Sequence, residues 1–238
     1  MTAELRSEHH RHLERLDIAL GALLGVIPDA VDHATESLLG GNIGLRADLD
    51  RWQAMVVAIS DDVDHTAEVI IARQAPMAGE LRFLMSCVRL VLIVSDTIDL
   101  VADVGGSAAS LTWDTEIPDR LRPLITAVGR EAAASWRTVS EMWDGKPEAN
   151  TSVLRAQDDR LAETRTALAA EAVARASDAA VVGQVAHVAH GYERIVRHAV
   201  SAGRLMQDLS HPGSYRAAGD AGEEDGSERA GREPPIVT

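Results

Sequence analysis

Three aspartates near the middle of the chain have the spacing of metal-binding side chains on a helix. Asp96, Asp99 and Asp103 stand three and four residues apart, at the end of an apolar run that begins at Leu81. In a helix this spacing places the three carboxylates along one side. Carboxylate oxygens are the ligands that hard cations prefer. The pattern makes the three aspartates candidate metal ligands. The alternative is a solvated helix face, paired with Arg194 or Arg197.

A second candidate group lies about one hundred residues later. His187, His190 and Glu193 follow one another at intervals of three residues. A glutamate and a histidine three residues apart occur in di-iron bundles, which need such a motif on each of two helices and glutamates from two more. The sequence offers no complete set, so we expect surface or interfacial histidines here. Glu193 is retained as a fourth candidate ligand beside the three aspartates.

Neither group is accompanied by a catalytic motif. The chain contains no G-x-S-x-G, no P-loop, no H-E-x-x-H and no paired cysteines. Its single cysteine, Cys87, stands in an apolar context, which predicts a small buried side chain in a reduced, cytoplasmic protein. These observations predict a protein that is not an enzyme.

Composition and charge narrow the class of protein further. Hydrophobic residues make up 46% of the chain and aromatic residues only 3%, a balance that favours an all-α fold. The formal charge of −14 argues against nucleic acid and against adhesion to anionic lipid. No apolar run approaches the roughly 20 residues of a membrane span, and the polar N-terminus lacks the apolar region of a signal peptide. We therefore expect a cytoplasmic protein without stable membrane insertion.

Apolar residues recur every three or four positions through six segments, which predicts six helices. Their expected ranges are 5–39, with a kink at Pro28, then 45–73, 76–104, 118–144, 150–176 and 178–209. Gly40 and the run Gly105 to Ser107 are predicted helix stops. The helices divide into two sets of three, over residues 1–108 and 109–209. Residues 210–238 are rich in Gly, Ala, Asp and Glu, and we expect this acidic tail to be disordered.

Two short motifs remain, one that begins with Gln74, Pro76, Leu81 and Arg82 and one that begins with Glu193 and Arg194. Both resemble the PhoU family of phosphate-regulatory proteins. The family signature is roughly QQP-x-A-x-D-L-R, an apolar stretch, and then E-R-x-G-D-x-x-x-N. The residues that match it are Gln74, Pro76, Leu81, Arg82 and Asp99 in the first half of the chain, and Glu193 and Arg194 in the second half. The chain departs from the signature at Ser95, Ile98 and Asp103, and in the second copy at Val196, Arg197 and Ser201.

The resemblance implies an architecture and a role. The fold would be two pseudo-repeated three-helix bundles, and the protein a homodimer. The function would be that of a non-enzymatic regulator of phosphate uptake and phosphate-starvation signalling. It would act as an adaptor on the phosphate ABC transporter and its sensor histidine kinase.

The resemblance also implies a cluster of iron, zinc or manganese, held by acidic pairs on the second and third helices of each repeat. Several of those positions are not acidic in this chain: Gln53, Val57, Ser60, Ala162 and Arg197. Asp99 and Asp103 remain as a proper pair, so we expect a degenerate metal site. Two alternatives stay open, namely a carboxylate-bridged metal-binding bundle that uses Asp96, Asp99, Asp103 and Glu193, and a metal-free helical protein with altered partners.

Overall fold

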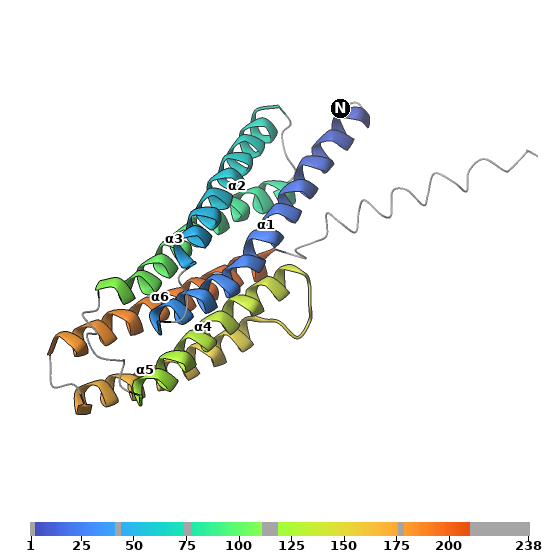
Figure 1. Ribbon diagram of the computed structural model, residues 1–238. Coiled ribbons are helices and arrows are strands. Elements are labelled where there is room, and N and C mark those ends of the chain that lie inside the picture. The colour runs from blue at the N-terminus through green and yellow to red at the C-terminus, as the bar shows by residue number, and fades with distance from the viewer. Residues whose placement is uncertain (1–2, 41–43, 74–77, 111–118, 176–178, 210–238) are drawn as a thin grey trace, which may run out of the picture.

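Six helices account for nearly all of the described chain. The computed structural model describes residues 3–40, 44–73, 78–110, 119–175 and 179–209. The helices, drawn in Figure 1, are α1 (Ala3–Leu38), α2 (Leu45–Arg73), α3 (Ala78–Ser110), α4 (Leu121–Trp143), α5 (Thr151–Arg175) and α6 (Ala179–Asp208). The described residues contain no strand. The predicted all-α, six-helix fold is confirmed.

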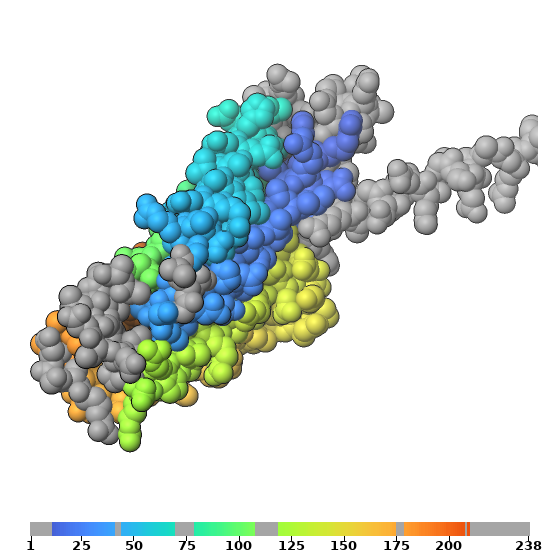
Figure 2. Space-filling model, in the orientation of Figure 1, coloured from blue at the N-terminus to red at the C-terminus, as the bar shows by residue number. Residues whose placement is uncertain are grey.

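The helices pack as two sets of three. In the first set α1, α2 and α3 contact one another, and in the second set α4, α5 and α6 do the same. The sets meet where α1 packs on α4 and where α3 packs on α6. Figure 2 shows α1 lying between α2 and α4 on the face turned to the viewer. Within the described residues, α2 and α5 contact only helices of their own set and therefore flank the bundle. The boundaries at 108 and 209 stay predictions, and residues 210–238 lie outside the described residues.

Of the two helix stops predicted at glycines, one agrees with the structure and the other does not. Gly40 has a φ of 86°, which suits the helix stop expected there. Gly105 and Gly106, in contrast, do not end α3, which continues to Ser110. A Cβ on Gly105 would lie 3.3 Å from the Cα of Ala34. Glycine is present at 105 because α1 and α3 approach closely, so the predicted stop at this position is wrong.

One helix has the length and composition of a membrane span. The stretch Arg11–Leu38 of α1 contains a window of mean hydropathy 1.3, and half of that window is buried within the bundle. A helix that other helices surround in a bundle is apolar on most sides because those sides are buried. The burial of α1 within the bundle accounts for its hydropathy in the same way. The helix also continues through Pro28, which is buried.

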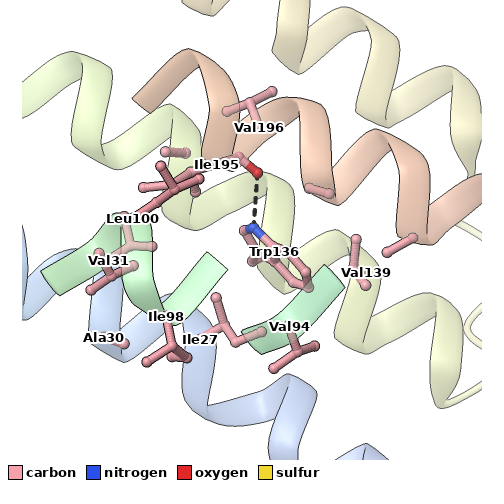
Figure 3. Packing of buried hydrophobic residues seen from close by; sticks show 14 of the residues in the cluster. Ile27, Ala30, Val31, Val94, Ile98, Leu100, Trp136, Val139, Ile195 and Val196 are labelled. Atoms are coloured by element: carbon pink, nitrogen blue, oxygen red, sulfur yellow. Dashed lines mark hydrogen bonds between the residues drawn. The ribbon is translucent and has the colours of Figure 1, made fainter. Parts of the chain in front are cut away.

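Two buried tryptophans of α4 link the central helices. The Nε1 of Trp136 donates to the backbone oxygen of Ile195 on α6 at 3.1 Å, as Figure 3 shows. The Nε1 of Trp143 donates to the backbone oxygen of Asp17 on α1, also at 3.1 Å. Both side chains are at most 1% exposed. The N–H group that each indole buries in the core therefore has a hydrogen-bond acceptor.

A third buried link joins α1 to α6. The hydroxyl of Thr35 donates to the backbone oxygen of Val31 at 2.8 Å and lies 2.7 Å from the hydroxyl of Tyr192. With the proton of Thr35 already used, the hydroxyl of Tyr192 is the donor in this pair. Gly129 of α4 packs against the same threonine, because a Cβ at position 129 would lie 2.3 Å from Thr35 Oγ1.

This contact generates a prediction about two helical glycines. Gly129→Ala should lower the free energy of unfolding by about 1–3 kcal/mol, because the added methyl group overlaps Thr35 and disturbs its bond to Tyr192. Gly106→Ala, where no atom lies within 4 Å of the added Cβ, should instead stabilise the protein by about 0.4–1 kcal/mol. Urea unfolding of both variants checks the pair. Equal effects would contradict the close approach at Gly129.

Candidate functional site

A pocket opens between α2 and α3, at the level where the resemblance would place a metal cluster. Its volume is about 300 Å³. The residues that line it are Gln53, Val56, Val57, Ser95, Ile98 and Asp99. They stand three and four residues apart on each helix, so each helix presents one side to the pocket. Val56 and Ile98 are buried and form an apolar floor, whereas the rim combines the polar side chains of Gln53, Ser95 and Asp99 with the exposed Val57.

The rim provides one carboxylate. The Nε2 of Gln53 donates to Oδ1 of Asp99 over a long 3.4 Å, and the side chain of Asp99 is exposed. Besides these, only the hydroxyl of Ser95 offers an oxygen on the rim. Magnesium and calcium require six or more oxygen ligands, and clusters require carboxylates that bridge the ions. The residues of this pocket do not fit the metal cluster that the resemblance implies.

The other two aspartates of α3 face a different neighbour. Oδ2 of Asp103 lies 3.2 Å from Nε2 of His187 on α6, and both side chains are more than half exposed. Asp96 is exposed and acts electrostatically on His198 of α6. The three carboxylates therefore follow one side of α3, as predicted. They serve two different seams, because Asp99 turns to α2 while Asp96 and Asp103 turn to α6.

The carboxylate of Glu193 is already paired with cationic side chains of the same protein. Its carboxylate forms ion pairs with Arg165 of α5 and with Arg197 one turn along α6, the latter at 2.7 Å. Nδ1 of His190 lies 3.4 Å away on the same carboxylate. Two guanidinium groups neutralise the single carboxylate, so a further cation is repelled. Arg197 thus pairs with Glu193 on its own helix, and within the described residues it forms no ion pair with Asp99.

The four candidate ligands are consequently not brought together. Across the described ranges, no group of three or more His, Cys, Asp or Glu side chains is arranged to hold a metal ion. Of the remaining motif residues, Leu81, Arg82 and Arg194 are exposed on α3 and α6. Gln74 and Pro76 lie outside the described residues. The pairing of Arg165 with Glu193 was missed in the sequence, since nothing in the local pattern links two side chains on different helices.

The seam between α3 and α6 contains a half-buried histidine. Nδ1 of His198 lies 3.0 Å from the hydroxyl of Thr97, which itself donates to the backbone oxygen of Ile93 at 2.7 Å. His198 is therefore the donor to Thr97 and can remain neutral there. Burial lowers the pKa of His198; Asp96 opposes this shift, and Arg194 and Arg197 add to it.

Solved structures share the all-α architecture of this chain. No family model matches the chain. Among solved structures, the crystal structure of PhoU from Pseudomonas aeruginosa superposes with a TM-score of 0.73 at 19% identity, over 84% of this chain and 97% of the other. The chain has the PhoU fold. The PhoU protein of Streptococcus pneumoniae gives a TM-score of 0.57 at 14% identity, over 84% of this chain and 96% of its own.

Curated PhoU homologs are also similar in sequence. The chain is 24% identical over 210 residues to "Phosphate-specific transport system accessory protein PhoU homolog 1" of Mycobacterium leprae, covering 85% of this chain and 92% of the relative. It is 24% identical over 204 residues to PhoU homolog 2 of Mycobacterium tuberculosis, covering 85% and 96%. The resemblance to the PhoU family that the motifs predicted is confirmed, and it extends along most of the chain.

The ligand geometry predicts the metal content of the purified protein. Protein prepared without chelator should contain no stoichiometric iron, zinc or manganese, and EDTA should leave its unfolding midpoint unchanged. The physical reason is that the α2–α3 pocket has one carboxylate and Glu193 is already neutralised. Elemental analysis and thermal unfolding check this. Stoichiometric metal together with a midpoint lowered by EDTA would establish the carboxylate-bridged alternative.

The environment of His198 predicts a pH dependence of stability. Since the folded-state pKa is lowered, the unfolded chain binds the proton more readily, and stability falls as the pH drops below the ordinary histidine value of about 6.5. The unfolding midpoint should therefore be lower at pH 5 than at pH 7.5, and the decrease should be smaller in His198→Gln. His65→Gln, which changes an exposed histidine of α2, is the control and should keep the wild-type decrease. Identical pH profiles for His198→Gln and the wild type would rule this out.

Proposed function

We infer that this chain regulates phosphate uptake by binding other proteins and carries out no chemical step of its own. The observation that carries this proposal is the similarity to phosphate-specific transport system accessory proteins, which spans 85% of this chain and 92–96% of the relatives' own lengths. A match of that extent covers both three-helix sets, not one shared helix pair. Because fold alone does not imply function, the agreement of sequence and fold is what supports the role.

In the proposed adaptor mechanism, the surface of the helical bundle binds partner proteins. The partners would be the phosphate ABC transporter and its sensor histidine kinase, and the protein would act in the cytoplasm as a homodimer. A rigid helical scaffold that binds one signalling state of a partner more tightly than another shifts the partner toward that state. In this way the chain would restrain the phosphate-starvation response when phosphate is plentiful.

The described residues favour an adaptor over an enzyme. The pocket between α2 and α3 contains a carboxylate, an amide and a hydroxyl, without a histidine or other strong base beside Ser95. The one thiol, Cys87, is fully buried, and burial raises its pKa far above the ordinary range. A protonated, inaccessible thiol is a poor nucleophile.

A second candidate is a metal-free helical protein of the same fold whose partners have changed. The replacement of acidic positions by Gln53, Val57 and Ser95 in the α2–α3 pocket favours it, because a surface that no longer holds cations presents different chemistry to a partner. This second candidate would also act by binding other proteins, but those proteins would not belong to phosphate uptake or phosphate signalling.

Deletion of the gene in its own host separates the two candidates. In phosphate-rich medium, expression of the phosphate transporter and uptake of labelled phosphate should rise several-fold, because the restraint on the starvation response is lost. The wild-type gene should restore repression, and so should Cys87→Ala, since the thiol has no catalytic part. Unchanged expression and uptake in the deletion strain would refute the phosphate role and leave the second candidate.

A further inference from the structure

We propose that the groove between α2 and α3 binds a cationic amphipathic helix of a partner protein, with an apolar side chain in the pocket and basic side chains beside Asp99. The groove is defined by the six pocket residues, which include Val57 on α2, together with Leu92 on α3. The proposal rests on the adaptor function above and specifies where and how that adaptor recognises a partner.

The first support is apolar surface that the fold leaves exposed. Val57, which lines the pocket, is 59% exposed, and Leu92, which precedes the lining residue Ser95 by about one turn of α3, is 60% exposed. Along α3, Leu81 and Met85 are 39% and 44% exposed and precede Leu92 on the same side of the helix. The positions 81, 85, 88 and 92 follow the spacing with which one helix contacts another lying in a groove. The apolar line therefore leads into the pocket.

The second support is the charge that borders this line. Asp50, Asp61 and Asp64 are exposed on α2, and Asp99 on α3. Within the described part of the chain, no ion pair engages any of these four carboxylates, although Asp99 accepts the long hydrogen bond from Gln53. An apolar groove with acidic borders is complementary to a helix that has an apolar stripe between basic residues. Such a border attracts the partner and fixes its orientation.

The third support is the uneven distribution of charged side chains along α3. The exposed cations of this helix, Arg82 and Arg89, both precede Leu92, whereas Asp96, Asp99 and Asp103 follow it. The acidic half coincides with the pocket. A partner helix would therefore place its basic end over the pocket and its less basic end over Arg82 and Arg89.

Charge also selects between occupants. A second copy that contributed the same groove would bring Asp99 against a like carboxylate, at a cost in free energy. Residues 210–238 contain six carboxylates and three arginines, so this segment is itself acidic. With a whole-chain charge of −14, neither occupant is complementary to the groove. The occupant with the right charge is a basic helix from another protein.

Three fluorescent peptides of equal length test the proposal on the full chain. The first has leucines at positions i, i+4, i+7 and i+11 with arginines on both flanks. The second replaces the arginines by glutamates, and the third replaces the leucines by alanines. We expect saturable binding of the first peptide, weakened by salt, and at least about tenfold weaker binding of the other two. Equal binding of the alanine peptide would overturn the proposal, because it would show charge attraction without use of the pocket.

Matched variants locate the binding. Val57→Asn combined with Leu92→Asn should weaken the first peptide about tenfold, because two apolar anchors are lost. Asp99→Asn should weaken it about threefold, as a partly exposed ion pair does. The control is Val173→Asn, which changes an exposed valine of α5 that is 68% exposed and should leave binding unchanged. Equal effects of the double variant and the control would overturn the proposal.

One further outcome would overturn the proposal. Sedimentation that shows a dimer dissociated by the Val57→Asn and Leu92→Asn pair would place a second copy in the groove and overturn the basic-helix assignment. The peptide assay uses purified protein and does not depend on phosphate-regulated expression. A failure of the groove and a failure of the phosphate role are therefore observed separately.

Discussion

Close packing of α1 on α4 and of α3 on α6 is the constraint on which the rest of the structure depends. It needs small residues where the helices approach: a Cβ on Gly129 of α4 would lie 2.3 Å from Thr35 of α1, and a Cβ on Gly191 of α6 would lie 2.5 Å from Val104 of α3. Buried hydrogen bonds from Trp143 of α4 to Asp17 of α1 and from Tyr192 of α6 to Thr35 of α1 join the two sets. Buried donors are costly to leave unpaired, so these bonds favour one relative placement of the two three-helix sets.

This placement gives the flanking helices different roles. In the part of the chain that the structure describes, α2 and α5 pack only within their own sets, so each forms an outer seam with a central helix. On the second set the outer seam is closed by ion pairs, since Arg165 of α5 reaches Glu193 of α6. On the first set the corresponding seam stays open as the α2–α3 pocket, with one carboxylate on its rim. The two halves share an architecture and differ in the chemistry of equivalent positions.

This difference between the two seams bears on the adaptor function proposed above. A surface ion pair contributes little to stability, but it removes charge from the surface that a partner would contact. The second set therefore offers a charge-compensated seam, whereas the first offers apolar side chains beside carboxylates that form no ion pair among the described residues. Recognition through the first set needs no metal ion, because shape, apolar area and charge are supplied by the side chains themselves.

The sequence by itself determined the helices, their order and the resemblance to PhoU proteins. Three- and four-residue periodicity is a local property of the chain, so the side of α3 that presents Asp96, Asp99 and Asp103 could be predicted from spacing alone. The helix stop predicted at Gly105 was wrong for a physical reason. A glycine that ends a helix and a glycine that lets two helices approach look alike in sequence.

Only the tertiary structure decided which side chains meet. Gln53 lies beside Asp99, His187 beside Asp103, and Arg165 beside Glu193, and each pair comes from two different helices. Such contacts depend on the distance and rotation between helices, to within a few ångströms. Those quantities are set by the whole buried core and by no single segment of the chain. For that reason spacing could identify the candidate ligands, but only the packing of the helices could show that they are not brought together around a metal ion.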